Sequence, residues 1–513
     1  MVGGLWVSYL IVFLASGCTL ILEIVAGRIL APFIGVSLYT WTSIIGVVLA
    51  GISLGNYLGG VVADWLGSRR TLGVILLAGG LASLVVLPLA TADLTTIFPR
   101  DYPLMLRIVL LTTLLFFPPS LILGMVSPVV VKLTLTDLKH TGNVVGKIYA
   151  FSTLGSIVGT FVTGFVLIAY FGTRWIVLGV GVVLIVMAIL FGDLFRARRE
   201  NAAVGLVSAI LFVALLFQIN VKNALSSGCY KETNYYCIKV TDHVVSADRL
   251  VKTLVLDHLI HSYNSIEEPT YLVYGYIKVY AEMVEYVAQT RPDYRAFFVG
   301  GGGYTLPRYM EAMQPQATIE VAEIDPGVTQ TDFEQMGLSP ATRVITYNAD
   351  AREVVEQKQR GEKYDLVFGD AFNDLQIPYH LTTRQFAQKI RTMLRDDGIY
   401  LALVIDKLRG GLFIPSYVRT VESVFRYVYI LADGNPWNST FANTYVVAAS
   451  ASPIDFERLK TVRGQGFNGQ TVTSVMPRDQ MDEWLRTAPS VLLTDDYAPA
   501  DNLVAPLFVE RGF

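Results

Sequence analysis

The segment Ala296-Phe-Phe-Val-Gly-Gly-Gly-Gly-Tyr-Thr305 joins a short apolar run to four consecutive glycines. The run has the length of a buried strand. The glycines allow a ligand to approach backbone N–H groups at the start of the next helix, which we expect to reach Met313. Strand and helix patterns then alternate, with further strands at Thr318–Ile324, Arg343–Thr346, Tyr364–Phe368 and Ile399–Val404. This alternation predicts an α/β domain with a doubly wound, parallel Rossmann sheet.

Carboxylates gather where these predicted strands end. Glu323 and Asp325 end the second strand, and Asp350 and Asp370 follow the third and fourth. Ligands of such sheets lie at the carboxyl ends of the strands. Glu323 follows the last glycine at the spacing of a carboxylate that binds two ribose hydroxyls, about 20 residues. The predicted adenosine site comprises Gly300, Gly301, Gly302, Gly303, Glu323, Asp325 and Asp350.

Simpler alternatives exist for each part of this pattern. Four glycines can form a tight turn, and a single acid after a strand, such as Asp350, is often the N-cap of the next helix. Thr305 stands where a dinucleotide fingerprint has its third glycine, and no second nucleotide-binding half is evident. The combination therefore favours one adenosine over a dinucleotide.

The first part of the chain has the composition of a membrane domain. Only 16% of the 513 residues are charged, against roughly 25% in soluble proteins, and the shortfall lies before about Asn220. A helix needs about 20 apolar residues to cross a bilayer. We expect an all-α bundle of about seven transmembrane helices, at Leu5–Leu22, Tyr39–Ala63, Leu72–Ala90, Leu104–Val131, Val144–Phe171, Trp175–Leu194 and Ala202–Ile219.

The links between these runs carry their positive charge unequally. Arg69, Arg70, Lys132, Lys139, Lys147, Arg196, Arg198 and Arg199 fall on the N-terminal side, against Arg28, Arg100, Arg107 and Arg174 opposite. This bias predicts a cytoplasmic N-terminus, so that seven helices place the globular domain outside the cytoplasm. A disulfide between Cys229 and Cys237 would persist there, the alternative being two buried thiols.

We therefore divide the chain into a transmembrane domain (1–222), a small β-subdomain with a linking helix (223–290) and the Rossmann-like domain (291–513). Alternating residues predict antiparallel strands at Tyr235–Thr241 and Val251–Asp257, followed by a helix at Tyr271–Ala288. The lipid bilayer is the first expected partner, and a homodimer through the β-subdomain is a further expectation. The net charge of -3 argues against nucleic acid, which requires a basic face.

Five motifs in the second half resemble one known family. They are Glu232-Thr-Asn-Tyr235-Tyr236, Leu254-Val-Leu-Asp257, Glu267-Glu268-Pro-Thr-Tyr271, Gly300–Gly303 and Glu323-Ile-Asp325-Pro326. In order and spacing they resemble the spermidine synthases, aminopropyltransferases of polyamine biosynthesis with a methyltransferase-like fold. The likeness runs over about the last 290 residues. The fusion to a membrane-embedded N-terminus resembles a bacterial and archaeal subgroup, which implies a multi-pass protein of a prokaryotic plasma membrane.

The resemblance implies a set of roles. The co-substrate is decarboxylated S-adenosylmethionine or S-adenosylmethionine, and no metal is expected, because His258 and His261 have no accompanying ligand pattern. Asp350 is the adenine-side acid, and Asp370 takes a proton from the attacking amine. The catalytic set is Asp370, Asp374 and Tyr271, and the substrate-binding set is Tyr235, Tyr236, His261 and Asn373.

Departures from the family pattern fall where the family holds its aminopropyl group and diamine. Tyr236 and His261 replace glutamines, Leu272-Val273 replaces His-Glu, and Asn373 replaces an acid. Three functions therefore remain open. They are aminopropyl transfer to an amine, methyl transfer or other chemistry on a different, membrane-associated or extracytoplasmic acceptor, and nucleoside binding without turnover by a sensor or transporter. Sulfonium donors are made in the cytoplasm, which conflicts with the side that the loop charges favour.

A C-terminal alkaline phosphatase fusion tests this topology, because the enzyme is active only outside the cytoplasm. We expect an active fusion, and we expect Cys229 and Cys237 to resist alkylation until they are reduced. An inactive phosphatase, an active cytoplasmic reporter at the same position and freely reacting thiols would place the domain on the other side.

Overall fold

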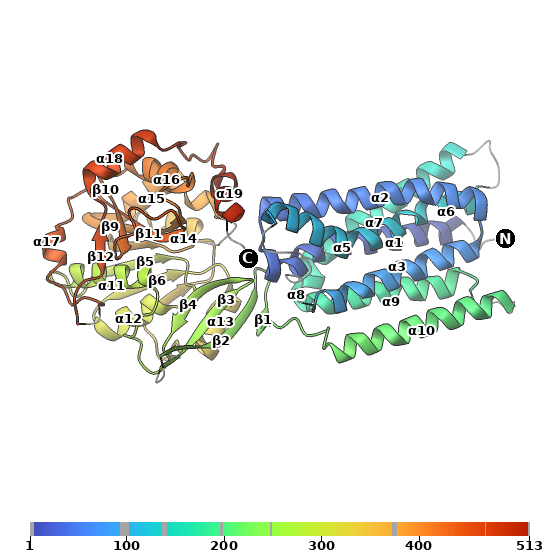
Figure 1. The fold of residues 1–513 in the computed structure, drawn as a ribbon, viewed down its shortest axis with the longest axis horizontal. Coiled ribbons are helices and arrows are strands. Elements are labelled where there is room, and N and C mark those ends of the chain that lie inside the picture. The colour runs from blue at the N-terminus through green and yellow to red at the C-terminus, as the bar shows by residue number, and fades with distance from the viewer. Residues whose placement is uncertain are drawn as a thin grey trace. The chain divides into compact units, whose positions relative to one another are not determined.

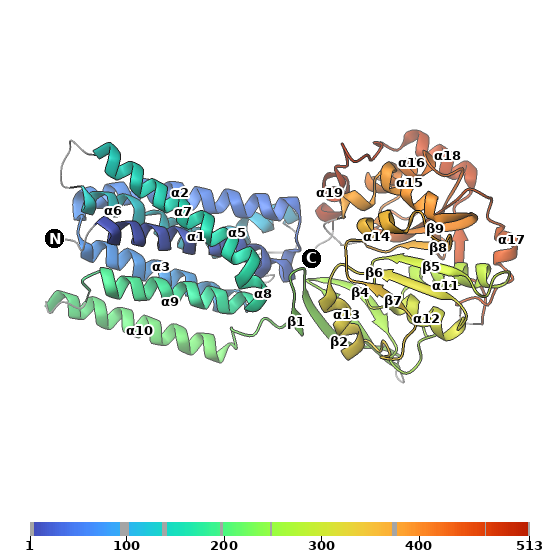
Figure 2. The same ribbon diagram turned by 180° about the vertical axis from the view of Figure 1, so that it is seen from behind.

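The chain, described here from a computed structural model, forms two compact units divided between Asn234 and Tyr235. The structure describes residues 5–92, 102–135, 141–194, 199–246, 249–371, 377–466 and 468–510. The first unit is helical and the second is α/β (Figures 1 and 2).

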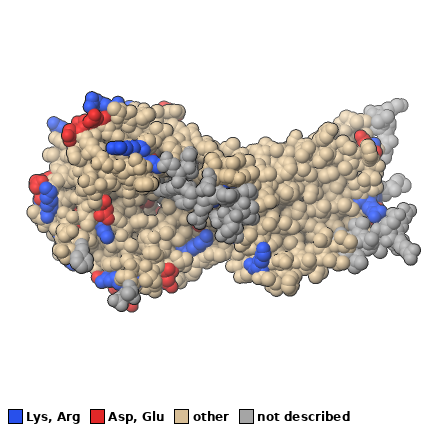
Figure 3. All heavy atoms as spheres, viewed as in Figure 1, with Lys and Arg blue, Asp and Glu red and all other residues tan. Residues whose placement is uncertain are grey.

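Long apolar helices make up the first unit. Its elements are α1 (Leu5–Ile34), α2 (Leu38–Leu66), α3 (Arg69–Leu89), α5 (Leu104–Gly124), α6 (Val126–Thr134), α7 (Thr141–Val162), the π-helical η2 (Thr163–Leu167), α8 (Ile168–Tyr170), α9 (Thr173–Phe191) and α10 (Arg199–Val221). Among the described residues, six helical spans are long and apolar enough to cross a membrane. The expected seventh span, Ala202–Ile219, falls in α10, of which Ala209–Val221 counts as a shorter apolar helix. In Figure 3 the middle of this unit shows almost no charged side chains on the face in view, which is compatible with a surface that faces lipid.

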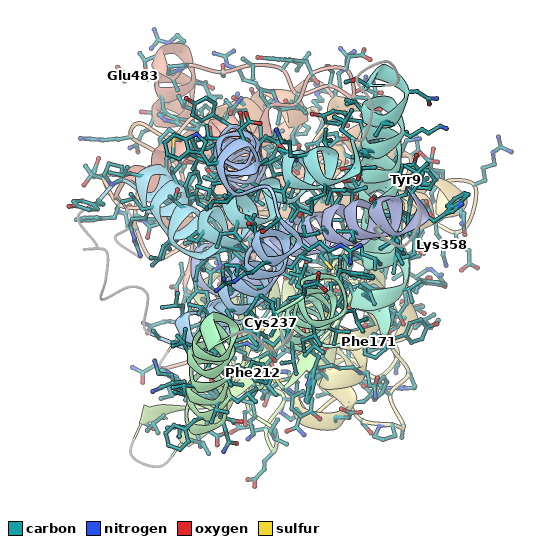
Figure 4. The ribbon with its side chains drawn as sticks, turned by 90° about the vertical axis from the view of Figure 1, so that its right-hand side faces the viewer. Tyr9, Phe171, Phe212, Cys237, Lys358 and Glu483 are labelled. Atoms are coloured by element: carbon teal, nitrogen blue, oxygen red, sulfur yellow. The ribbon has the colours of Figure 1, made fainter. Side chains whose placement is uncertain are left out.

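Glycines bring the helices of this unit into close contact. A Cβ atom at Gly155 of α7 would fall on the carbonyl oxygen of Phe13 in α1, and one at Gly159 would lie 2.6 Å from the carbonyl oxygen of Gly17. Near the same interface the ring of Tyr9, labelled in Figure 4, stacks on Phe151 with 4.7 Å between centroids. Small residues spaced four apart therefore allow α1 and α7 to pack backbone against backbone.

Cys229 and Cys237 are both disulfide-bonded, whereas Cys18 is free and buried. The α/β unit begins beside Cys237 with three antiparallel strands, β2 (Cys237–Ser246), β3 (Arg249–Leu256) and β4 (Leu259–Asn264), preceded in the chain by β1 (Lys231–Glu232). Ile238, Leu254 and Leu256 of this sheet pack on Val328 and Met336 at α13. This small core fixes the sheet against the next layer.

Among the described residues, a second sheet has eight strands in the order β12-β10-β11-β9-β8-β5-β6-β7. Its strands are β5 (Arg295–Val299), β6 (Thr318–Ala322), β7 (Ile345–Tyr347), β8 (Tyr364–Gly369), β9 (Leu394–Asp406), β10 (Tyr427–Asp433), β11 (Asn443–Ser450) and β12 (Thr473–Val475). Strands β5 to β9 are parallel, as predicted. Strands β10 to β12 add an antiparallel edge that the sequence did not reveal. The strand order reverses between β5 and β8, which is where such sheets bind ligands.

Helices cover both faces of this sheet, with α15 and α16 on one and α11 and α12 on the other (Figures 1 and 2). The helices are α11 (Gly275–Ala288), α12 (Thr305–Met313), α13 (Pro326–Gln335), α14 (Ala351–Lys358), α15 (Arg384–Met393), α16 (Phe413–Glu422), α17 (Phe456–Leu459), α18 (Arg478–Thr487) and α19 (Ala500–Glu510), with a 3₁₀ turn η3 (Tyr379–Leu381). Layers on both faces leave the carboxyl ends of the strands as the open edge.

Gly155→Ala tests the contact between α1 and α7. The added methyl would overlap the Phe13 carbonyl, so we expect a loss of about 1–3 kcal/mol and a lower melting temperature in detergent. Gly146→Ala is the matched control, because it lies on the same helix with nothing within 4 Å of its Cβ, and it should leave stability equal or slightly raised. Equal melting temperatures for the two variants would contradict the packing.

Candidate active site

A cleft lies at the carboxyl ends of β5, β6 and β8, next to the point where the strand order reverses. Its empty space, including the part open to solvent, measures about 640 Å³. The residues predicted from sequence that line it are Gly300, Gly302, Glu323, Asp350, Asp370, Tyr236 and His261. Residues from two sheets, and from the ends of β5, β6, β7 and β8, therefore meet in one cavity.

The glycine loop after β5 requires conformations that other residues rarely adopt. Gly300 has φ +97° and Gly302 has φ +49°, and a Cβ at Gly300 would lie 2.9 Å from the carbonyl oxygen of Asp370. Tyr304, the N-cap residue of α12, adopts φ +50° without being glycine, and its hydroxyl lies 3.1 Å from that of Thr346. Left-handed backbone is strained for a tyrosine and typical of ligand sites.

Glu323 ties this loop to the end of β6. Its Oε2 accepts the N–H of Gly301 at 2.8 Å, and its Oε1 accepts the N–H of Asp325 at 2.9 Å. Burial raises the pKa of Glu323, and these backbone hydrogen bonds oppose that shift. Two carboxylate oxygens have four lone pairs in all, so the carboxylate can still accept a hydroxyl from a ligand in the cleft.

Asp350 and Asp325 both cap helices, but only Asp350 lines the cleft. Asp350 Oδ1 accepts the N–H of Arg352 at 2.8 Å at the start of α14, and its Oδ2 lies 2.9 Å from Nε2 of His380. Asp325 caps α13 through Gly327, is 1% exposed and is not among the described lining residues. Asp350 can therefore serve both as a helix cap and as a residue of the cleft wall. Asp325 instead joins Glu323 to the start of α13.

Asp370 is an acid of the cleft whose pKa is strongly shifted. It ends β8 beside the glycine loop, and its N–H donates to the carbonyl oxygen of Val299. Burial raises the pKa of Asp370 to about 8, and a hydrogen bond from the Tyr276 side chain opposes the shift. A carboxyl whose pKa lies near neutrality is suited to proton transfer.

The remaining predicted residues fall into two groups. Tyr236 and His261 line the cleft, and burial raises the pKa of Tyr236, with the Glu323 charge adding to the shift. Tyr235 is 43% exposed. Its pKa is raised first by partial burial and then by the charges of three nearby acids. Tyr271 and Gly303 are not among the described lining residues. The Arg249 guanidinium lies 4.2 Å from the centre of the Tyr271 ring, and a Cβ at Gly303 would overlap the side chain of Ser262.

Asn373 and Asp374, also predicted from sequence, lie outside the described residues. Two residues that the sequence reasoning missed do reach the site. Tyr276 bonds to Asp370, and His380 bonds to Asp350. His380 is one of five histidines in the chain and follows the fourth predicted strand, so its rarity and position were the available signal.

Chemically, the cleft combines carboxylates that can accept hydrogen bonds with a buried carboxyl suited to proton transfer. Glu323 and Asp350 are held by backbone hydrogen bonds, and the backbone of the buried Asp370 lies against Gly300. Among the described residues no cluster of three or more histidine, cysteine or acidic side chains is arranged to hold a metal ion.

Comparison with known proteins points to a transferase. A polyamine aminopropyltransferase of Vibrio vulnificus (strain CMCP6) is 31% identical over 109 residues, which are 21% of this chain and 36% of that protein. A probable polyamine aminopropyl transferase of Bifidobacterium longum (strain NCC 2705) is 23% identical over 225 residues, 40% of this chain and 48% of that protein. This chain is therefore similar to polyamine aminopropyltransferases over part of its length. It spans less than half the length of these two aminopropyltransferases.

Two further similarities accompany this one, and no family model matches the chain. The human eEF1A lysine and N-terminal methyltransferase is 23% identical over 142 residues, 26% of this chain and 20% of that protein. Among solved structures, a probable spermidine synthase from Corynebacterium glutamicum ATCC 13032 is 19% identical, with a TM-score of 0.43 over 50% of this chain and 93% of that one.

Glu323→Gln tests the nucleoside site. A charge-assisted bond to ribose is worth about 1.5–3 kcal/mol, so we expect calorimetric affinity for methylthioadenosine to fall roughly ten- to a hundredfold. The amide of glutamine would also face the N–H of Gly301 or Asp325, so the melting temperature must be measured on the same sample. Unchanged affinity, or no affinity in the parent protein, would contradict the assignment.

Proposed function

We propose that this protein is a membrane-integral transferase that moves an aminopropyl group from decarboxylated S-adenosylmethionine to an amine, with Asp370 as general base. The observation that carries the proposal is that a buried carboxyl with a pKa of about 8 lines the same cleft as the two candidate nucleoside-binding acids, Glu323 and Asp350. The similarity to polyamine aminopropyltransferases supports the same reaction class.

In the proposed complex, Glu323 accepts the ribose hydroxyls and Asp350 accepts the amino group of adenine. Both acids lie at strand ends beside the glycine loop, which lets the sugar approach the backbone. The sulfonium of the donor then lies toward Asp370. Its positive charge favours the ionised carboxyl, so donor binding lowers the pKa of Asp370 and prepares it to accept a proton.

The transfer step moves one proton and one alkyl group. The unprotonated acceptor nitrogen attacks the aminopropyl carbon in line with sulfur. The C–N bond forms, and the electron pair of the breaking C–S bond goes to sulfur, which gives neutral methylthioadenosine. The nitrogen carries a positive charge after the attack, and it gives its proton to Asp370. Tyr276, bonded to Asp370, helps to orient the carboxylate. We assign Tyr235, Tyr236, His261, Tyr271, Asn373 and Asp374 to the acceptor side as proposals from the sequence.

Methyl transfer from S-adenosylmethionine is the second candidate. It is favoured by the similarity to the human methyltransferase and by Leu272 and Val273, which stand where the family has His-Glu and supply no charge for a second ammonium. The nucleoside contacts and the role of Asp370 are the same in both reactions. Incubation with each donor in turn, followed by detection of methylthioadenosine or S-adenosylhomocysteine, separates the two.

The lipid bilayer is the proposed environment of the six long apolar helices, and we keep the extracytoplasmic side and the homodimer through the β-subdomain as proposals. The disulfide-bonded state of Cys229 and Cys237 supports an oxidising compartment. A donor made in the cytoplasm would then have to reach the outer side, so the side of the membrane bears directly on the donor.

Asp370→Asn tests the base. The change preserves size but removes the proton acceptor, so we expect turnover to fall about 100- to 10,000-fold with donor affinity little changed. In the parent, kcat/KM for the donor should rise roughly tenfold per pH unit below about pH 8 and level off above it, because only the ionised form accepts a proton. The variant should lose this dependence, and near-normal turnover would remove Asp370 from the mechanism.

Stability gives an independent control on the same preparations. The folded carboxyl holds its proton up to about pH 8, whereas the unfolded one releases it near its ordinary value of 3.8, so the parent loses stability as pH rises between these values. The Asn variant lacks this loss, and its melting temperature should gain on the parent from pH 5 to pH 8. A purely structural Asp370 would instead leave the variant less stable at every pH.

A further inference from the structure

His380 lies at the wall of the cleft with both its ring and its backbone engaged. It belongs to η3, in the loop that follows β8, and it lines the cleft together with Pro378 and Leu381. Its Nε2 lies 2.9 Å from Oδ2 of Asp350. Because an ionised carboxylate can only accept, Nε2 is the nitrogen that carries the hydrogen in this contact.

The backbone of His380 is held by Arg352, which is itself paired with Asp495 from the C-terminal part of the chain. Arg352 Nη1 donates to the carbonyl oxygen of His380 at 2.8 Å, and the same guanidinium makes two bonds to Asp495, at 2.9 and 2.5 Å. Thr383 also donates to Asp495, at 2.6 Å. The paired Arg352 lowers the pKa of Asp495. The acid that the C-terminal sequence contributes therefore fixes the loop that carries His380.

Asp350 is consequently restrained at both oxygens. Oδ1 accepts from the N–H of Arg352, and Oδ2 accepts from His380. A carboxylate held at both ends has a fixed plane, and its remaining lone pairs are presented in set directions. Because Asp350 lines the cleft, those lone pairs can receive an amino group but would repel a carbonyl oxygen.

We infer that His380 is a positioning residue that orients Asp350 to select a 6-aminopurine over a 6-oxopurine nucleoside. The inference rests on the proposed function, because it concerns the nucleobase end of the same cleft. Arg352 bonds to the His380 backbone and to Asp495. Selectivity for the nucleobase therefore also depends on Asp495, which lies far from Asp350 and His380 in the sequence.

The test compares calorimetric affinities for methylthioadenosine and methylthioinosine. His380→Leu should weaken binding of the adenine compound by roughly tenfold, the scale of one hydrogen bond to a charged group, with little change for the inosine compound. His380→Gln should retain the selectivity, because the glutamine amide can donate from the same place as Nε2. His243→Leu is the matched control on an exposed histidine of β2 and should behave like the parent.

A double-mutant cycle separates positioning from simple support. In an Asp350→Asn background, His380→Leu should have no further effect on selectivity, because His380 acts through the carboxylate. Selectivity unchanged by His380→Leu in the parent background would overturn the inference while leaving the proposed function standing. Equal losses for both nucleosides with a lower melting temperature would also overturn it. Absence of nucleoside binding by the parent would overturn both proposals together.

Discussion

The hydrogen bond from the Gly301 N–H to the carboxylate of Glu323 is the contact on which the cleft depends. It joins the turn after β5 to the end of β6, and the second oxygen of Glu323 holds Asp325, which caps α13. A buried carboxylate is stable only when such donors surround it, since an unpaired charge in this position would be expensive. The same residue therefore builds the loop and supplies the acceptor for the proposed contact with ribose.

Burial then differentiates acids that are chemically alike. Asp325 and Asp350 are both helix caps, yet one is enclosed and the other faces the cleft. Asp370 has few donors around it, so burial raises its pKa to about 8, while Asp495, held by Arg352, has its pKa lowered. The pKa of a carboxyl group in this unit thus depends on the number of hydrogen-bond donors around it and on its exposure to water.

The helical unit packs differently, through backbone contact at Gly155 and Gly159, while large apolar side chains such as Phe165 remain on its surface. This pattern is compatible with a bilayer, which offers no hydrophobic gain between helices. Hydropathy alone located these spans, since each is a long uninterrupted apolar run. It did not settle α10, whose apolar part is shorter than the run predicted at Ala202–Ile219.

Sequence by itself determined the two-part organisation, the parallel strands β5 to β9 and the positions of Glu323, Asp350 and Asp370, because these follow from periodicity and from acids at strand ends. It placed the start of α11 too early, at Tyr271 instead of Gly275, since an apolar run does not mark where a helix begins. Only the tertiary structure brought Tyr276 to Asp370 and His380 to Asp350, and sent Tyr271 to Arg249. These pairings join elements far apart in the chain, and nothing local in the sequence specifies which side chains will face each other across a cleft.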